Sequence, residues 1–118
     1  MITRADVDAM CAALPGARYS EPPELVSWKV GDKMFACFGD FEGEFGGVSV
    51  KTADIETAQM LIDAGEAIKA PYFHRSWVRL DFGSTDRGYA EHRIHVSYDL
   101  IRKSLKKAVR DALPERSA

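Results

Sequence analysis

The sequence lacks the features that mark several large classes of protein. Its 118 residues include only two cysteines, Cys11 and Cys37, too few for a disulfide framework, which indicates a reduced, cytoplasmic protein. No apolar run approaches the roughly 20 residues that span a bilayer. Residues 1–6 also lack the basic segment and apolar block of a secretory signal. We therefore expect neither a membrane protein nor a disulfide-stabilised secreted one.

What the chain does contain suits a globular protein. Hydrophobic residues make up 46% of it and charged residues 29%, so it is not a disordered tail. This length leaves room for one hydrophobic core without a structural metal. We expect residues 1–118 to form a single domain.

The charges are unevenly distributed along the chain. The net charge is −2, but residues 1–68 hold five basic and twelve acidic groups, while residues 69–118 hold eleven basic and six acidic groups. Such asymmetry is found where one face meets nucleic acid or another anionic partner. It is also expected when the two halves of a chain simply attract each other, so the charge pattern leaves both interpretations open.

Apolar residues recur with a period of 3.6 over residues 3–14, which predicts a helix that begins at Thr3 and ends before Pro15. Alternating residues predict strands over 25–30 and 77–82, and further strands are expected over 33–38 and 48–51. Gly31-Asp32 is expected to join the first two strands as a type II′ turn. The inner face of the first helix consists of Val7, Met10, Cys11 and Leu14.

Three further helices are expected. Thr52 is the predicted N-cap of the second helix, whose inward residues are Ile55, Ala58, Leu61 and Ile62. After a long connection over 65–76, a short helix is predicted over 86–94 and a last helix over 96–113. The predicted order is helix, three strands, helix, strand, helix, helix. This mixed order favours an α+β fold, with an antiparallel sheet and helices packed on one face.

Several phrases occur in a characteristic order: Leu14-Pro15-Gly16, Trp28-Lys29-Val30-Gly31-Asp32-Lys33-Met34-Phe35, Val48-Ser49-Val50-Lys51, a strand opening at Trp77, and Ser97-Tyr98-Asp99-Leu100-Ile101. Together they resemble the MmcQ/YjbR family of small bacterial proteins, from residue 3 to about 110. The resemblance implies a compact α+β fold with a double-wing arrangement, similar to certain DNA-binding domains and to the frataxin-like fold. It implies DNA binding, a function inferred from that shape, and no established reaction. Ser97 is then expected to cap the last helix, and Tyr98 to seat its ring on the sheet.

Two basic surfaces are candidates for such DNA binding. Contact through phosphates gives weak, salt-sensitive and largely sequence-independent affinity. The loop over 39–47 would oppose it, because Asp40, Glu42 and Glu44 come without a basic residue. The candidates on the sheet are Lys29, Lys33, Lys51, Arg75 and Arg79. The candidates on the last helix are Arg102, Lys103, Lys106, Lys107 and Arg110.

The alternative is a module that binds a protein or a small ligand. Residues 70–77 gather aromatic rings, a histidine and an arginine, a mixture common at interaction hot spots. Such a loop is also typical of one that closes over the end of a core. The residues proposed for partner contact are Tyr72, Phe73, His74 and Trp77.

Catalytic motifs are weak by comparison. His92-x-x-His95 with His74 and Glu91 is the best metal-ligand candidate, but the run has no spaced cysteine or carboxylate set. Phosphate loops, dinucleotide fingerprints and Gly-x-Ser-x-Gly elbows are absent from the sequence. We therefore predict a non-enzymatic protein with no catalytic residue, no cofactor and no metal site.

Overall fold

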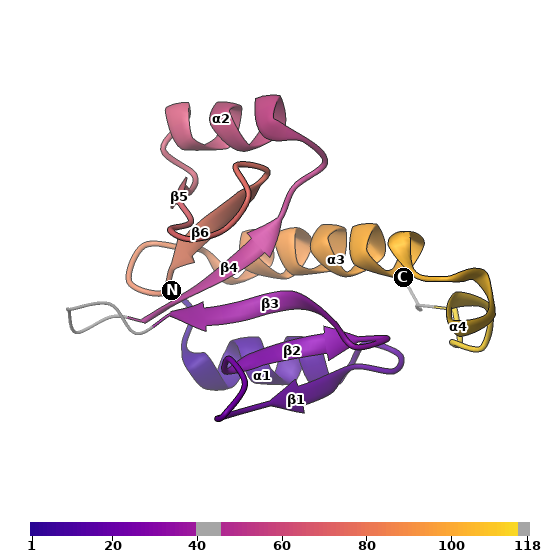
Figure 1. Ribbon diagram of the computed structural model, residues 1–118. Helices are drawn as coiled ribbons and strands as arrows, with labels where there is room; N and C mark the ends of the chain where they lie inside the picture. The colour runs from indigo at the N-terminus through magenta and orange to yellow at the C-terminus, as the bar shows by residue number, and fades with distance from the viewer. Residues whose placement is uncertain (40–45, 116–118) are drawn as a thin grey trace.

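The computed structural model describes residues 1–39 and 46–115. Within these residues the chain folds into four helices and six strands, an α+β fold (Figure 1). The predicted order of helices and strands is confirmed, with two short strands added that the sequence pattern did not indicate, β1 and β5. The elements are α1 (Arg4–Ala12), β1 (Arg18–Ser20), β2 (Ser27–Val30), β3 (Lys33–Gly39), β4 (Gly47–Lys51), α2 (Ile55–Asp63), β5 (Ile68–Lys69), β6 (Trp77–Asp81), α3 (Arg87–Ser104) and α4 (Lys107–Asp111).

The strands described form one antiparallel sheet in the order β1-β2-β3-β4-β6-β5. Because β4 pairs directly with β6, Lys51 at the end of one strand lies opposite Trp77 at the start of the other. The intervening helix α2 and strand β5 lie at the margin of the sheet, next to β6 (Figure 1). This arrangement brings α2, the end of β4 and residues 69–77 to one edge of the molecule.

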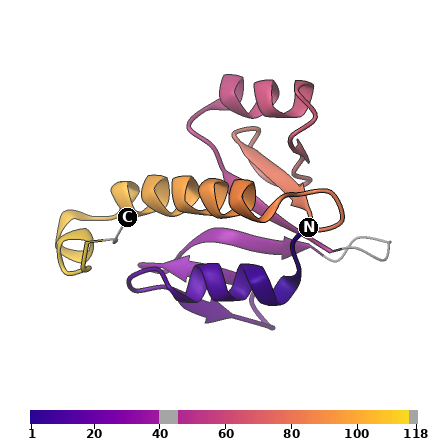
Figure 2. The same cartoon turned by 180° about the vertical axis from the view of Figure 1, so that it is seen from behind.

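One face of the sheet supplies the core. Val48 pairs with Leu80, and Val50 with Val78, and all four side chains are fully buried. Helices α1 and α3 run side by side across the sheet (Figure 2). The ring of Tyr98 packs edge-on against Phe35, with centroids 5.3 Å apart, which confirms its predicted seat on the sheet. Ala58 and Leu61 of α2 join the same cluster.

The start of α1 is as predicted. The Thr3 hydroxyl accepts a hydrogen bond from the Asp6 backbone N–H at 3.1 Å, and the Asp6 carboxylate accepts one from the Thr3 N–H at 3.0 Å. This reciprocal pair is a capping box, which satisfies two N–H groups that the helix leaves free. These hydrogen bonds hold the pKa of Asp6 below its ordinary value.

The β2–β3 turn differs from the expected type II′. Both Gly31 and Asp32 have positive φ angles, 54° and 64°, which is the pattern of a type I′ turn. A side chain at position 31 would also collide with the core, because a Cβ there would lie 2.7 Å from Cδ1 of Leu105. Glycine is thus required both by the backbone and by the close approach of the residue that follows α3.

The predicted cap of α2 was wrong. Asp54, not Thr52, is the N-cap, and its carboxylate accepts a hydrogen bond from the Thr57 N–H at 2.7 Å. Thr52 is fully buried, and its hydroxyl donates instead to the carbonyl of Ser76 at 2.6 Å. Ile55, predicted to face inward, is 39% exposed because it lies in the first turn beyond this edge of the core.

The predicted division of the C-terminal helices was also wrong. Helix α3 runs without interruption through His95, and the chain leaves the helical conformation at Leu105, where ψ is 155°. Ser97 is not a cap but lies inside α3, buried against the sheet. Its hydroxyl donates to the Phe35 carbonyl at 2.6 Å and accepts from the Lys51 N–H at 2.9 Å. A polar residue in the middle of the helix thus joins it to β3 and β4, which local patterns could not reveal.

None of the helices described is long and apolar enough to cross a membrane.

Candidate ligand-binding site

The five basic residues proposed on the sheet do not form one free surface. Arg79 is 3% exposed, and its guanidinium donates to Asp81 at 3.2 Å and to the Gly39 carbonyl at 3.4 Å. Lys29 forms an ion pair with Glu24. Both side chains are thus paired within the protein, and a phosphate group would have to compete with these partners for them.

The other three lie at the end of the sheet where β4 finishes and β6 begins, but in different surroundings. Lys33 is exposed beside the β2–β3 turn. Lys51 donates from its ammonium to the Ser76 hydroxyl at 2.9 Å. Arg75 is exposed in the segment before β6. The structure therefore brings Lys51 and Arg75 together with the proposed partner-binding residues rather than with Lys29 and Arg79.

The basic face predicted on the last helix is divided by the end of α3. Arg102 turns back to the chain terminus, donating to the carbonyls of Leu113 at 3.0 Å and Pro114 at 2.6 Å. Arg110 lies on α4, 3.6 Å from the carboxylate of Asp111. Lys103, Lys106 and Lys107 stay exposed around the link between the two helices. The acidic residues expected to oppose DNA binding, Asp40, Glu42 and Glu44, lie outside the described residues.

The four residues of the proposed partner loop separate into two groups. Phe73 stacks on Trp77, with ring centroids 4.7 Å apart and planes inclined by 24°. Tyr72 has a positive φ of 70° and is fully exposed, pointing away from the core. His74 is exposed but hydrogen-bonded through its Nδ1 to Ser76. The stacked pair, rather than the whole loop, forms part of a pocket.

This pocket lies between α2 and residues 69–77 and has a volume of about 340 Å³. We call it the aromatic pocket. Its lining combines the stacked rings with three aliphatic side chains, one amide and two cations, and among the residues described it includes no carboxylate. The lining residues are Ile55, Gln59, Ile62, Lys69, Ala70, Phe73, Arg75 and Trp77.

The side chains of the two cations in the aromatic pocket have no partner among the residues that the structure describes. Neither the Lys69 ammonium nor the Arg75 guanidinium makes a hydrogen bond or ion pair within residues 1–39 and 46–115. Gln59 donates its amide N–H to the Asp63 carboxylate at 2.8 Å, one turn along α2, and Asp63 itself does not line the pocket. The aromatic pocket therefore presents positive charge beside an apolar floor.

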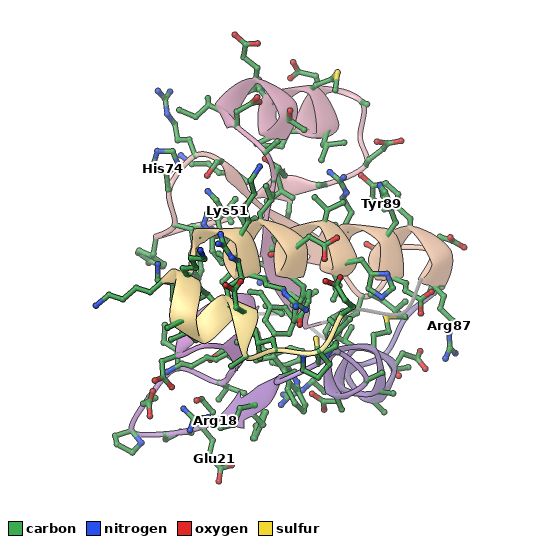
Figure 3. All side chains as sticks on the ribbon, turned by 90° about the vertical axis from the view of Figure 1, so that its right-hand side faces the viewer. Arg18, Glu21, Lys51, His74, Arg87 and Tyr89 are labelled. Atoms are coloured by element: carbon green, nitrogen blue, oxygen red, sulfur yellow. The ribbon has the colours of Figure 1, made fainter. Side chains whose placement is uncertain are left out.

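A hydrogen-bond network holds the loop that forms one wall. The backbone N–H and the hydroxyl of Thr52 both donate to the Ser76 carbonyl, at 2.8 and 2.6 Å. The Ser76 N–H donates to Nδ1 of His74 at 3.1 Å, and the Ser76 hydroxyl lies 2.8 Å from the same nitrogen. Lys51 and His74, both bonded to Ser76, lie close together in Figure 3, at the edge of the molecule below α2.

The network also assigns the histidine tautomer. Since the backbone N–H of Ser76 can only donate, Nδ1 of His74 must accept, and the neutral ring carries its hydrogen on Nε2. The Ser76 hydroxyl can then donate to Nδ1 while it accepts from Lys51. Residues 74–77 are thereby fixed against the end of β4. Thr52 was expected to cap α2 and Ser76 was not among the candidate residues, since nothing in the local pattern links two residues 24 positions apart.

A second, shallower hollow adjoins the aromatic pocket at Ile55 and has a volume of about 560 Å³. It is lined by Lys51, His74 and Ser76 together with the start of α2. Two carboxylates, those of Asp54 and Glu56, also line it. The hollow is thus lined by side chains of both charges, whereas the charged side chains described in the lining of the aromatic pocket are cations.

The structure also locates the residues considered for catalysis. Within residues 1–39 and 46–115, no three His, Cys, Asp or Glu side chains gather as a metal ion requires. Burial raises the pKa of the Cys37 thiol, and burial with the nearby Asp8 carboxylate raises that of Cys11 far above its ordinary value. A raised pKa disfavours the thiolate, the nucleophilic form. Both cysteines are therefore buried and poorly nucleophilic.

Comparison with known proteins agrees with this fold. The sequence model of the YjbR family matches residues 12–100, which include most of the sheet and the aromatic pocket. The chain belongs to the YjbR family. No curated protein sequence matches it.

Proposed function

We propose that this chain is a non-enzymatic binding protein and that the aromatic pocket is its binding site. The observation that carries the proposal is a stacked pair of rings, Phe73 and Trp77, beside two cations that the described protein leaves without partners. A volume of about 340 Å³ lies within the range of pockets that hold small ligands. The occupant is a small ligand, or a single side chain of a partner protein.

The test uses the two indole N–H signals of the protein in a ¹H–¹⁵N correlation spectrum, with 1-naphthalenemethanol and 1-naphthoate as probes. Trp77 lines the aromatic pocket, whereas the Trp28 indole donates to Asp8 on α1 at 2.8 Å. We expect the Trp77 signal to shift saturably and the Trp28 signal to stay in place. A Trp77→Phe variant assigns the two signals. If neither probe moves the Trp77 signal at millimolar concentration, the proposal is wrong.

DNA binding is the second candidate, and one observation favours it. The β2–β3 turn packs under the α3–α4 link, since Leu105 and Val109 fill the space above Gly31. Exposed lysines flank this junction, Lys33 on the strand side and Lys103, Lys106 and Lys107 on the helix side. Such a cluster supports weak phosphate contact through counterion release.

Fluorescence anisotropy of labelled duplex and single-stranded DNA across a salt series tests this candidate. Lys33→Glu with Lys106→Glu should abolish low-salt binding, while the charge-matched control, Lys69→Glu with Arg75→Glu, should preserve it. Equal loss in both double variants would indicate a response to total charge rather than to this surface. Absence of binding by the unaltered protein at low salt would remove DNA as a partner.

A further inference from the structure

We infer that the ligand of the aromatic pocket is a planar organic anion, an aromatic ring carrying a carboxylate, sulfonate or phosphate group. The inference rests on the proposed function, because it names the chemical class that this pocket takes. Three properties of the lining point to it: flat apolar surface, unbalanced positive charge and a rigid wall.

The apolar part of the lining suits a ring. Phe73 and Trp77 are already stacked, so the pocket presents aromatic surface, and Ile55, Ile62 and Ala70 complete the lining with aliphatic carbon. Aromatic pairs attract beyond their buried area when they are offset-stacked or edge-on. A flat ring that enters this space therefore exchanges water for aromatic and aliphatic contacts.

The charge of the lining selects an anion. Lys69 and Arg75 are the ionisable residues among those that line the aromatic pocket, and both are exposed. The carboxylates of Asp54 and Glu56 line the neighbouring hollow instead, and that of Asp63 does not line the aromatic pocket. A neutral ligand would leave both cations unpaired, whereas an anion gains a charge-assisted contact with each.

The fixed wall lowers the cost of forming those contacts. Arg75 lies between His74 and Ser76, whose side chains and backbone are bonded to each other and, through Ser76, to Thr52 and Lys51. Its backbone is thus fixed before a ligand arrives. Binding then does not have to offset the entropy lost by ordering this loop.

The test compares two probes that share a ring and differ in charge, 1-naphthoate and 1-naphthalenemethanol, each titrated while the Trp77 indole signal is followed. Solvent screens exposed cations, so we expect 1-naphthoate to bind only about tenfold more tightly at low salt. Lys69→Gln with Arg75→Gln should bring the two dissociation constants together without weakening 1-naphthalenemethanol. The matched control, Lys33→Gln with Lys106→Gln, removes two cations elsewhere and should keep the tenfold difference.

The outcomes separate failure of the anion inference from failure of the proposed binding site. Equal binding of the probes to the unaltered protein would overturn the anion inference and leave the pocket as a binding site. A preference that survives Lys69→Gln with Arg75→Gln would also overturn it. Failure of both probes to bind would overturn both proposals. Because the substituted side chains are exposed, the variants should keep the dispersed spectrum of the folded protein. A further titration with 1-naphthyl phosphate in place of 1-naphthoate distinguishes a phosphate ligand from a carboxylate.

Discussion

The interior at the centre of the fold and the aromatic pocket contain the same kinds of side chain in opposite circumstances. At the centre, the Arg79 guanidinium donates to Asp81 and Gly39, and the Tyr98 hydroxyl donates to the Pro15 carbonyl at 2.6 Å. In the aromatic pocket, Arg75 has no hydrogen bond or ion pair with the part of the chain described, and Trp77 stays partly exposed. A buried polar group must be paired because water cannot reach it. An exposed cation beside exposed rings carries no such requirement and is available to a ligand.

The largest contrast between the two regions should be in chemical reactivity. Cys11 and Cys37 are buried, and burial raises the pKa of both thiols, so the reactive thiolate is scarce at neutral pH. We expect them to react with Ellman's reagent more than about a hundredfold more slowly than Tyr72→Cys, a thiol placed at the exposed tip beside the aromatic pocket. In guanidinium chloride all three should react alike. Fast reaction of the native cysteines would show that the centre opens readily.

Stability should follow the same division. Tyr98→Ala removes a fully buried ring from its contact with Phe35, and we expect it to lower the free energy of unfolding by about 3–5 kcal/mol. Tyr72→Ala, which removes a fully exposed ring of the same kind, should change it by less than about 0.5 kcal/mol. Urea denaturation measures both variants. A comparable loss in the two would contradict the division into a core and a free edge.

The network beneath the aromatic pocket joins the two regions, and a smaller loss is expected there. Thr52→Val keeps the shape of the buried side chain but removes the hydroxyl that donates to Ser76, at a cost of about 1–2 kcal/mol. It should also weaken 1-naphthoate binding, because the wall that carries Arg75 is then less firmly fixed. Ser84→Ala, an exposed hydroxyl in the loop after β6, is the control and should change neither quantity.

The smallest effect concerns the cap of α2. Hydrogen bonds from Thr57 hold the pKa of Asp54 below its ordinary value of 3.8, so the ionised carboxylate is favoured in the folded protein. Its contribution is therefore complete above pH 3.8 and is lost as the pH falls through the lower, folded-state pKa. Asp54→Ala should have a slightly lower melting temperature at pH 6, and the difference should shrink in acid. A difference that grows in acid would contradict this assignment of the cap.

Elements with a continuous local pattern were predictable from the sequence. The apolar period of α1 and the alternation of β6 are properties of neighbouring residues, and those elements were confirmed. Strands β1 and β5 have three and two residues, and their pairing partners rather than their composition make them strands. At the end of α3, Leu105 packs over Gly31, a residue more than 70 positions earlier, and no local pattern contains that contact.

The site divides in the same way. Phe73, Arg75 and Trp77 were among the proposed residues because they form an unusual cluster within one short segment. Ile55 and Ile62 were predicted to face the core, Gln59 was not among the candidate residues, and only the fold brings all three opposite that segment. Arg79 was proposed as a cation of the sheet that would contact DNA phosphates. It is buried because Gly47 beside it has no side chain, and a Cβ there would lie 2.6 Å from the guanidinium carbon.

The most direct test of the central claim, that the aromatic pocket is the free site and prefers anions, is the titration of both indole signals with 1-naphthoate and 1-naphthalenemethanol. We expect the Trp77 signal to shift saturably and the Trp28 signal to stay in place. At low salt we expect 1-naphthoate to bind about tenfold more tightly than 1-naphthalenemethanol. Equal shifts at both indoles, or equal affinity for the two probes, would contradict it.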